Sequence, residues 1–471
     1  MGKKTDTILD WGNQRFPVTK VWDEHLAKYY APKNFNFWWY FGSLSMLVLV
    51  LQIVTGIWLT MYYKPDAKMA FDSVEFIMRD VNWGWLIRYL HSTGASAFFI
   101  VVYLHMFRGL IYGSFKKPRE LVWILGMFIF FCLMAEAFMG YLLPWGQMSF
   151  WGAQVIISLF SAIPYFGEDL TLWIRGDYVI ADATLNRFFA FHVIAVPLAI
   201  VLLVFLHIVA LHQVGSNNPD GIDIKKLKDH WTEVPLDGIP FHPFYSVKDL
   251  VGVAVFMIVF SIILFYMPDM GGYFLEHANF IPADPLQTPE HIAPVWYFTP
   301  YYAMLRAVPD KLGGVIVMGA SIFVLFILPW LDRSKVKSIR YRGILTKGAV
   351  TTFVISFLVL GYLGTQPATP IAVTFARIFT CLYFAFFLLM PVYSKLDKTK
   401  PVPDRLTESS PMRVCPAIPC KFASALWQKF STLSVYSKLK LIVDQVKAVL
   451  CKLDEFLFEC YKTIAKVVKK Q

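Results

Sequence analysis

The chain has 471 residues, of which 57% are hydrophobic and 16% are charged, and its formal net charge is +11. This composition, with a mean hydropathy of +0.52, excludes an ordinary water-soluble domain. We expect an all-α, polytopic membrane protein with no nucleic-acid partner.

Residues 1–36 contain no apolar stretch followed by a small-residue cleavage site, so we expect no signal peptide in this N-terminal segment. Eight apolar runs follow, each long enough to span roughly 30 Å of hydrocarbon. They lie at residues 37–62, 87–112, 121–143, 189–211, 249–267, 314–331, 345–363 and 371–392. We expect two membrane domains. Residues 37–212 would form a four-helix bundle that includes the loop 144–188, and residues 213–392 would contain the other four spans and the loop 268–313.

Positive charge is distributed unequally between the two sides of these spans. The segments on the side of the N-terminus, residues 1–36, 108–120, 212–249 and 332–347, carry 20 Lys and Arg residues. The opposite loops, residues 63–87, 144–188, 268–313 and 364–370, carry 7. The positive-inside rule therefore places both termini in the cytoplasm or its equivalent.

The tail, residues 393–471, is strongly basic, with 15 Lys and Arg against 7 Asp and Glu. Apolar residues from Leu439 to Val467 recur every three or four positions, which predicts an amphipathic helix. We expect this helix to lie on the anionic cytoplasmic leaflet or to pack on a partner. The nearby Cys415 and Cys420 are poorly spaced for a zinc site, and we interpret them as structural or incidental.

Four histidines lie inside two of the apolar spans, where an imidazole is costly without a partner. His91 and His105 are 14 residues apart in the second span, and His192 and His207 are 15 apart in the fourth. At ~100° per residue, these separations end about 40° short of and 60° past the starting face. Both spans run from outside to inside, so we expect an outer pair (His91, His192) and an inner pair (His105, His207).

Two imidazoles on facing helices suit a six-coordinate haem iron. The six cysteines form no Cys-x-x-Cys-His motif, so any haem is held without a covalent bond. The alternatives are four unrelated core histidines or a proton relay.

Glycines in the neighbouring spans repeat the histidine interval, and a flat macrocycle needs a helix surface without side chains. They are Gly42 and Gly56 in the first span, and Gly126 and Gly140 in the third. Helix–helix contact through small residues is the alternative. Arg88 and Arg108 lie three residues from His91 and His105, where they could pair with haem propionates or anchor the helix at the interface.

These residues resemble cytochrome b of the respiratory quinol:cytochrome c oxidoreductase, the cytochrome bc complex or complex III. The resemblance covers roughly residues 8–392. It rests on RYLHSTGAS around His91, GYLLPWGQMSFWGAQVI, GSNNPDGI, FHPFYSVKDL, and PVWY with LRAVPDKLGGV. It implies two non-covalent b-type haems, with the lower potential at the outer pair and the higher at the inner pair. The implied setting is a homodimeric complex with a Rieske iron-sulfur protein and a cytochrome c1-type subunit, surrounded by lipid in a bacterial inner membrane.

The resemblance also implies an outer quinol-oxidation pocket, formed by the segments Gly140–Ile156 and Pro294–Tyr297. Quinol would give one electron to the iron-sulfur protein and the other to the haems. Its lining residues would be Phe138, Tyr141, Met148, Ile156, Trp296 and Tyr297. The usual family motif is Pro-Glu-Trp-Tyr, but this chain has Val295 in place of the glutamate. Our hypothesis is that Glu290 supplies the missing carboxylate, with Tyr297 as a second polar contact. The alternative is a solvated loop glutamate.

An inner quinone-reduction site is implied at His212, Lys248 and Asp249, with Ser216 and Asn217 as supporting contacts. Read alone, the Lys-Asp pair would be an interfacial feature. Two other functions remain open. A diheme membrane anchor of a quinone-linked dehydrogenase or hydrogenase would also contain bis-histidine sites, and a solute transporter would contain intramembrane polar residues but no reducible chromophore.

Overall fold

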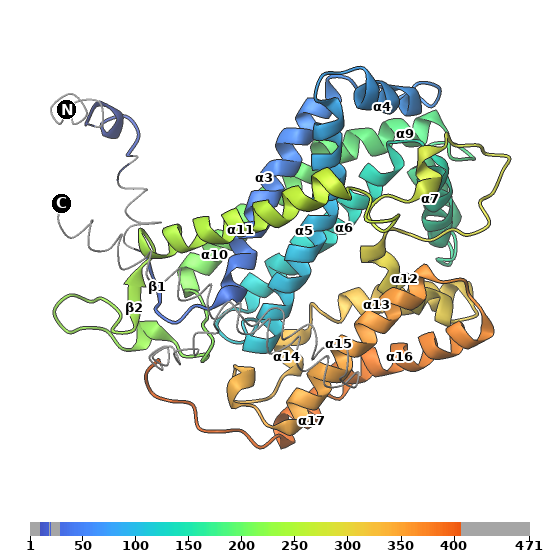
Figure 1. The fold of residues 1–471 in the computed structure, drawn as a ribbon. Helices are drawn as coiled ribbons and strands as arrows, with labels where there is room; N and C mark the ends of the chain where they lie inside the picture. Colours follow the sequence, from blue (N-terminus) through green and yellow to red (C-terminus); the bar gives the residue numbers. More distant parts are fainter. Residues whose placement is uncertain (1–9, 18, 20–28, 407–471) are drawn as a thin grey trace, which may run out of the picture. The chain divides into compact units, whose positions relative to one another are not determined.

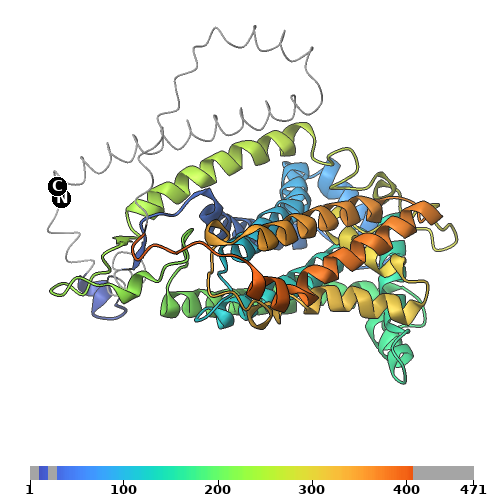
Figure 2. The same cartoon turned by 90° about the horizontal axis from the view of Figure 1, so that it is seen from below.

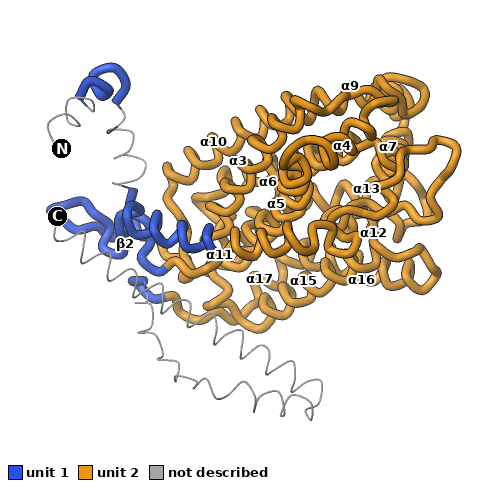
Figure 3. The backbone as a smooth tube through the Cα atoms, turned by 45° about the horizontal axis from the view of Figure 1, so that its top comes forward, with its two compact units in different colours: residues 1–34, 224–254, 403–471 blue, residues 35–223, 255–402 orange. Residues whose placement is uncertain are grey.

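The computed structural model describes residues 10–17, 19 and 29–406. The predicted tail helix, Cys415 and Cys420 lie outside the described residues. The chain divides into two compact units (Figure 3). Among the described residues, the first unit contains 10–17, 19, 29–34, 224–254 and 403–406, and the second contains 35–223 and 255–402. The predicted domain boundary at residues 212 and 213 therefore falls inside the second unit.

The first unit is organised around a short antiparallel sheet and one buried carboxylate. Strand β1 (Tyr30–Pro32) pairs with β2 (Gly238–Pro240), with Ala31 opposite Ile239. Beside this sheet, Asp237 accepts hydrogen bonds from both sides of the Arg405 guanidinium, each at 2.8 Å, and forms an ion pair with Lys33 at 3.1 Å. Because the two-pronged geometry of arginine matches a carboxylate, Asp237 fastens three distant stretches of chain together.

The second unit contains the first four predicted spans as long apolar helices (Figure 1). They are η2 (Phe37–Trp39) with α3 (Tyr40–Thr60), α5 (Gly84–Tyr112), α6 (Glu120–Leu142), and the continuous run α9 (Asp182–Ala190), η3 (Phe191–Ala195) and α10 (Val196–Val214). Helix α3 packs along α5, and α6 packs along α10. Each observed helix begins and ends within a few residues of its predicted span, except that α9 extends the fourth span towards the outer loop.

A second helical group follows in the same unit. It contains α12 (Thr299–Ala307), α13 (Lys311–Phe323), α14 (Leu328–Leu331), α15 (Ile344–Thr365), α16 (Pro370–Leu388) and α17 (Met390–Leu396). Helix α15 packs against both α12 and α16, and α15 and α16 run side by side in Figures 1 and 2. The apolar helix α11 (Phe244–Tyr266) begins in the first unit and ends in the second. The chain is therefore a multi-pass helical membrane protein.

In the described part of the chain, seven helices are long and apolar enough to span a membrane, one fewer than the eight predicted. The difference lies at residues 314–331, where α13 ends at Phe323 and α14 resumes at Leu328. Pro329 contributes to the break, because it lies in the first turn of α14 and has no N–H to donate to the carbonyl of Leu325. Instead, the N–H of Leu325 bonds the carbonyl of Ile322 at 3.2 Å, a tighter three-residue turn.

Short helices cap the bundle near the predicted outer loops. They are α4 (Ala70–Arg79), α7 (Gln147–Phe160), α8 (Gly167–Arg175), η5 (His277–Phe280) and η6 (Trp296–Phe298); the remaining 3-10 turns are η4 (Ile224–Lys226) in the first unit and η7 (Ile339–Tyr341) in the second. Helix α7 overlaps the segment Gly140–Ile156 that is predicted for the outer pocket. Its buried Ile157 and Phe150 pack in one hydrophobic core with Ile77 of α4, Leu142 of α6 and Leu185 of α9. This core holds the end of α6 that carries Tyr141 and the start of α7 that carries Met148.

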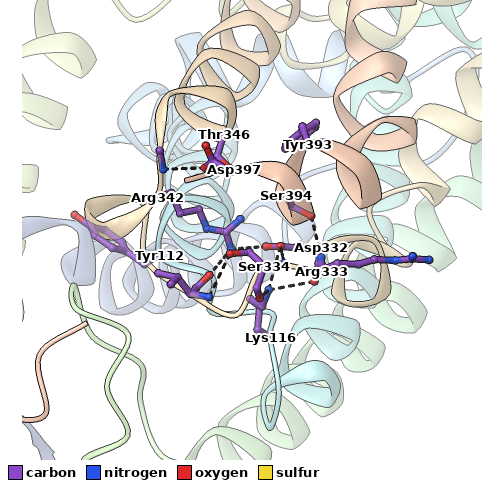
Figure 4. Close-up of polar contacts among 12 residues, drawn as sticks. Tyr112, Lys116, Asp332, Arg333, Ser334, Arg342, Thr346, Tyr393, Ser394 and Asp397 are labelled. Carbon is purple, nitrogen blue, oxygen red and sulfur yellow. Dashed lines mark hydrogen bonds and ion pairs between the residues drawn. The ribbon is translucent and has the colours of Figure 1, made fainter. Parts of the chain in front are cut away.

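A buried ionic cluster joins the turn between α5 and α6 to the segment before α15 (Figure 4). Asp332 forms ion pairs with Lys116 at 3.0 Å and with Arg342 at 2.5 Å. Lys116 also donates to the carbonyl of Ser334 at 2.6 Å. Burial works to raise the pKa of the Asp332 carboxyl, but Arg342 and Lys116 outweigh it and hold that pKa below its usual range. The cluster therefore stabilises this end of the bundle as long as the carboxylate is ionised.

Candidate functional site

The four histidines meet as two pairs, each with one imidazole from α5 and one from the η3–α10 run. The ring centroids of His91 and His192 are 6.1 Å apart, and those of His105 and His207 are 6.4 Å apart. A metal ion between two imidazoles requires two metal–nitrogen bonds of roughly 2 Å and two half-rings of about 1 Å, or about 6 Å in all. Both pairs have the separation that a bis-histidine haem site needs.

A π-helical turn reconciles the unequal spacing of the two pairs. His192 lies in η3, where the N–H of Val196 bonds the carbonyl of Phe191 five residues earlier. Pro197 follows and has no N–H for the carbonyl of Val193, which favours such a turn. Because a π-bulge inserts one residue into the helix, the 15 residues from His192 to His207 rotate about as far as 14 α-helical ones. The sequence prediction missed this turn, although the mismatch of one residue was its signal.

Each imidazole lies against one of the four glycines. A Cβ atom would lie 3.3 Å from Cε1 of His105 at Gly42, 3.2 Å from Cε1 of His91 at Gly56, and 3.3 Å from Cε1 of His207 at Gly126. At Gly140 it would lie 2.8 Å from Nδ1 and 2.9 Å from Nε2 of His192. At all four positions the nearest atoms belong to an imidazole ring. At Gly314, by contrast, the nearest atom is backbone, because a Cβ there would meet the carbonyl oxygen of Leu305 at 2.7 Å. The interpretation of the four glycines as helix-packing residues is therefore disfavoured, and the site fits a flat group beside the imidazoles.

Hydrogen bonds at Nδ1 orient the two outer imidazoles. His91 Nδ1 lies 2.9 Å from Thr55 Oγ1, whose own hydroxyl donates to the carbonyl of Leu51 at 2.7 Å. His192 Nδ1 lies 2.9 Å from both the carbonyl oxygen and the side-chain Oε1 of Glu136. When Nδ1 donates, Nε2 keeps the lone pair that a metal requires. Sequence reasoning missed both partners, although Glu136 is an acidic residue inside an apolar helix and such residues are functional candidates.

The two arginines lie near the two imidazole levels. Arg108 donates to Ser114 Oγ at 3.2 Å, lies 3.4 Å from His105 Nδ1, and places its guanidinium 5.3 Å from the Trp39 ring centre. Arg88, three residues before His91 in α5, lines a cavity of about 240 Å³. Both positions place a positive charge close to a histidine pair, which is compatible with the predicted propionate contacts.

The predicted outer pocket residues are distributed over α6, α7 and η6. The Tyr297 ring is 3% exposed and stacks on Phe99 with centroids 3.8 Å apart. Trp296 Nε1 donates to Ser96 Oγ at 3.1 Å, which anchors the segment to α5. On α7, Met148 is buried and Ile156 is half-buried, and a Cβ at Gly152 would lie 3.9 Å from the Tyr141 ring. Phe138 packs edge-on against Phe188, with ring centroids 5.5 Å apart.

The position that lacks the family's glutamate and the two nearby glutamates differ in burial and in their contacts. Val295 is 3% exposed, so its aliphatic side chain is part of the core. Glu290 lies exposed in the loop. Glu276, which the sequence prediction did not consider, accepts a short hydrogen bond from the Tyr141 hydroxyl and lines the same cavity as Arg88. Because Glu276 and Tyr141 are 135 residues apart in sequence, no local pattern could have revealed the contact.

The residues predicted for the inner site are divided between the two units. His212 lies in the last turn of α10 in the second unit, and Lys248 and Asp249 lie in α11 in the first. Asn217 donates to the carbonyl of Tyr112 at 2.9 Å and to Ser114 Oγ at 3.1 Å, so its amide orders the loop after α10. The carbonyl of Ser216 accepts from Arg119 at 3.3 Å.

Comparisons with known proteins identify the family. Residues 26–215 match the family model described as cytochrome b/b6/petB, and residues 282–384 match cytochrome b(C-terminal)/b6/petD. The chain is 64% identical over 412 residues to the cytochrome b of Allochromatium vinosum, covering 86% of this chain and 99% of that one. It is 51% identical over 405 residues to the cytochrome b of Rhodospirillum rubrum, covering 86% and 96%.

A solved structure agrees with these relatives. The structure titled hyperthermophilic respiratory Complex III contains a chain that matches with a TM-score of 0.76 and 39% identity, covering 82% of this chain and 99% of that one. The predicted resemblance is thereby confirmed, and with it b-type haem binding and a role in electron transport. The chain belongs to the cytochrome b family, as a cytochrome b of the bc1 type found in respiratory complex III.

Proposed function

We propose that the chain oxidises quinol at an outer site and reduces quinone at an inner site, within a quinol:cytochrome c oxidoreductase. The observation that carries this proposal is the pairing of four imidazoles into two sites, separated by 14 helical residues of α5, or roughly 21 Å. When bound, two b-type haems supply an electron path between the two sides of the membrane. The polypeptide then has to orient the ligands, exclude water and move protons.

The outer pair holds its imidazoles through Thr55 and Glu136, whereas the inner pair has the guanidinium of Arg108 beside His105. A carboxylate that accepts from a ligand imidazole makes it a stronger electron donor, while a nearby positive charge favours the reduced metal. Since Arg88 also places a positive charge near the outer pair, the carboxylate of Glu136 is the feature that supports the lower potential that we assign to the outer level and, by comparison, the higher potential that we assign to the inner level.

At the outer site, the apolar surroundings of Tyr141, Met148, Ile156, Trp296 and Tyr297 would hold the quinol ring. In the family's reaction, one electron passes to a Rieske iron-sulfur protein and the other remains in this chain. We assign a cytochrome c1-type subunit as the further partner, a homodimeric complex, and a bacterial inner membrane with both termini in the cytoplasm. The loop charges, 20 basic residues against 7, support this orientation.

At the inner site, His212, Asp249 and Lys248 would bind quinone and deliver the protons that its reduction consumes. Ser216 and Asn217 would contribute through the loop that they order. The arrangement thus takes up protons on the cytoplasmic side and releases them on the other, which contributes to the proton gradient.

A reduced-minus-oxidised spectrum of the purified complex tests the haem count. We expect two distinct b-type signals in the wild type, loss of the lower-potential signal in His192→Ala, and loss of the higher-potential signal in His207→Ala. Quinol:cytochrome c turnover, measured with an inhibitor for each quinone site, separates this function from that of a dehydrogenase anchor. A single haem signal, or two signals lost together in either variant, would contradict the proposal.

A further inference from the structure

The proposed function requires quinol to lose two protons at the outer site, yet the valine at position 295 cannot accept one. The loop 268–313 contains five carboxylates in which a substitute could be found: Asp269, Glu276, Asp284, Glu290 and Asp310. A substitute must be close to the buried tyrosines and must also have an exit for the proton. The contacts of each carboxylate decide which of them meets both conditions.

Four of the five carboxylates do not meet both conditions, because three interact with other groups and one is exposed. Asp269 lies 3.4 Å from His277, and Asp284 accepts from the backbone N–H of Leu286 at 2.8 Å. Asp310 caps α13 by accepting from the N–H of Gly313 at 2.6 Å. The Glu290 side chain is exposed.

Glu276 meets both conditions. Its Oε2 accepts the hydrogen bond from the Tyr141 hydroxyl, and Tyr141 follows Gly140, the glycine in contact with the His192 imidazole. On its other side, Glu276 lines the cavity of about 240 Å³, whose wall includes Arg88 and, at the surface, the exposed Arg79 and Phe280. The carboxyl therefore joins the tyrosines of the outer pocket to a cavity with exposed residues at its rim.

The environment of Glu276 suits proton transfer near neutral pH. Burial raises the pKa of Glu276 to about 7, although the hydrogen bond from Tyr141 acts in the opposite direction. Burial also raises the pKa of Tyr297, and the charge of Glu276 adds to this effect. A group whose pKa is close to the working pH can both take up and release a proton readily.

We propose that Glu276 replaces the carboxylate absent at Val295, by receiving a quinol proton through the Tyr141 hydroxyl and releasing it through the cavity beside Arg88. This inference rests on the proposed function. The quinol O–H bond breaks as its proton passes to the Tyr141 oxygen, while the Tyr141 proton passes to Glu276 Oε2. The two electrons go to the iron-sulfur protein and to the haem, so neither side chain is oxidised. The carboxylic acid of Glu276 then loses its proton to water through the cavity.

Other charged or titratable groups face Glu276, and they contribute to any pH dependence. They are Tyr141 and Tyr297 in the pocket, Glu75, Arg79, Arg88 and Tyr89 around the cavity, and the His277–Asp269 pair in its own segment. Glu75 pairs with Arg79 at 2.5 Å. Arg88 supplies a further positive charge at the cavity wall, which favours the ionised form of Glu276 when a proton has left.

The test compares Glu276→Gln, which keeps the shape of the side chain, with Glu290→Gln and with an exposed control in α8, Glu168→Gln. The assay uses membranes that contain the full complex and follows haem b reduction by added quinol, together with quinol:cytochrome c turnover from pH 5.5 to 9, a span of about two units on each side of neutrality. We expect Glu276→Gln to slow quinol oxidation by roughly 10- to 100-fold and to flatten the pH profile near neutrality. We expect Glu276→Asp to recover part of the rate with a displaced profile, and Glu168→Gln to match the wild type.

The outcomes separate the inference from the function on which it rests. If quinol does not reduce the haems of the wild type at the outer site, the proposed function fails. If the wild type is active and Glu276→Gln keeps its rate and pH profile, or if Glu290→Gln causes the larger loss, the role assigned to Glu276 is wrong. Haem content per chain shows whether each variant is assembled. Should Glu276→Gln fail to assemble, Tyr141→Phe decides the question, because it removes the same relay and must reproduce both the slower rate and the flattened profile.

Discussion

Adding a methyl group at Gly140 should remove the outer haem selectively. A Cβ there would lie 2.8 Å from Nδ1 and 2.9 Å from Nε2 of His192, whereas ordinary contacts are about 3.5–4.0 Å, so the ring must move by roughly 1 Å. His192 is held by two 2.9 Å contacts to Glu136, and a shift of this size would break both. Because the single Nδ1–H is shared between these two acceptors, losing the shared hydrogen bond costs about 1.5–3 kcal/mol, or roughly 10- to 100-fold in haem affinity.

The other glycines should respond more weakly, because the displacement that they require is smaller. At Gly56 the Cβ would lie 3.2 Å from His91 Cε1, so a shift of roughly 0.3 Å restores contact distance. At Gly348 in α15 nothing lies within 4 Å of an added Cβ, which makes Gly348→Ala the matched control. The expected order of outer haem loss is therefore Gly140→Ala far above Gly56→Ala, with Gly348→Ala unchanged.

Redox-titrated difference spectra of the purified variants, at equal protein concentration, measure the outer and inner haems separately. Gly140→Ala should lose the lower-potential signal and keep the higher-potential one, because Gly126 and Gly42 serve the inner pair. The reasoning is refuted if Gly140→Ala keeps a full outer signal at an unchanged potential. It is also refuted if both signals fall together, since the contact that would be disturbed belongs to His192 alone.

Two further substitutions act on single contacts. Glu136→Gln should raise the midpoint potential of the outer haem, because a charged acceptor at His192 becomes neutral; the change of about 1 kcal/mol corresponds to roughly 40 mV in a one-electron titration. An unchanged or lower potential would exclude this role for Glu136. Asp332→Asn should destabilise the protein by about 3 kcal/mol or more, seen as a lower temperature of haem release, because Arg342 and Lys116 are left buried without their counter-charge. Since the pKa of Asp332 is held below its usual range, its stabilisation is complete above about pH 4 and disappears as the pH falls through the lowered pKa. The variant should lack this acid dependence, and a parallel loss in both proteins would argue against the cluster as its source.

Features that extend over many residues could be predicted from the sequence. Hydropathy summed over about 20 residues placed the membrane helices. Loop charge then set their direction, and direction determined that His91 faces His192 and that His105 faces His207. The structure brings together these same pairs. Span hydropathy and loop charge are both sums over many residues, so an error at a single residue has little effect on either prediction.

Features that depend on one residue or one distant contact could not be predicted in this way. Pro329 interrupts a span whose hydropathy is otherwise continuous, because hydropathy does not register a missing N–H. Glu290 stood out through its proximity to the PVWY motif in sequence, whereas Glu276 is brought to Tyr141 only by the packing of the 268–313 loop on α6 and α7. The sequence shows that a carboxylate is missing at Val295, and the fold shows which carboxylate of the 268–313 loop contacts Tyr141.

The π-turn at η3 is a place where the η3–α10 run can lose a residue while His192 and His207 keep their common orientation. If one residue were lost within Phe191–Ala195 while His192 was kept, the turn would become ordinary α-helix, and His192 and His207 would still face α5 together. A residue lost between Pro197 and Leu206 would instead rotate His207 away by about 100°. We therefore expect the deletion of one residue from this helix to be tolerated beside the outer ligand, and not along the stretch that leads to the inner one.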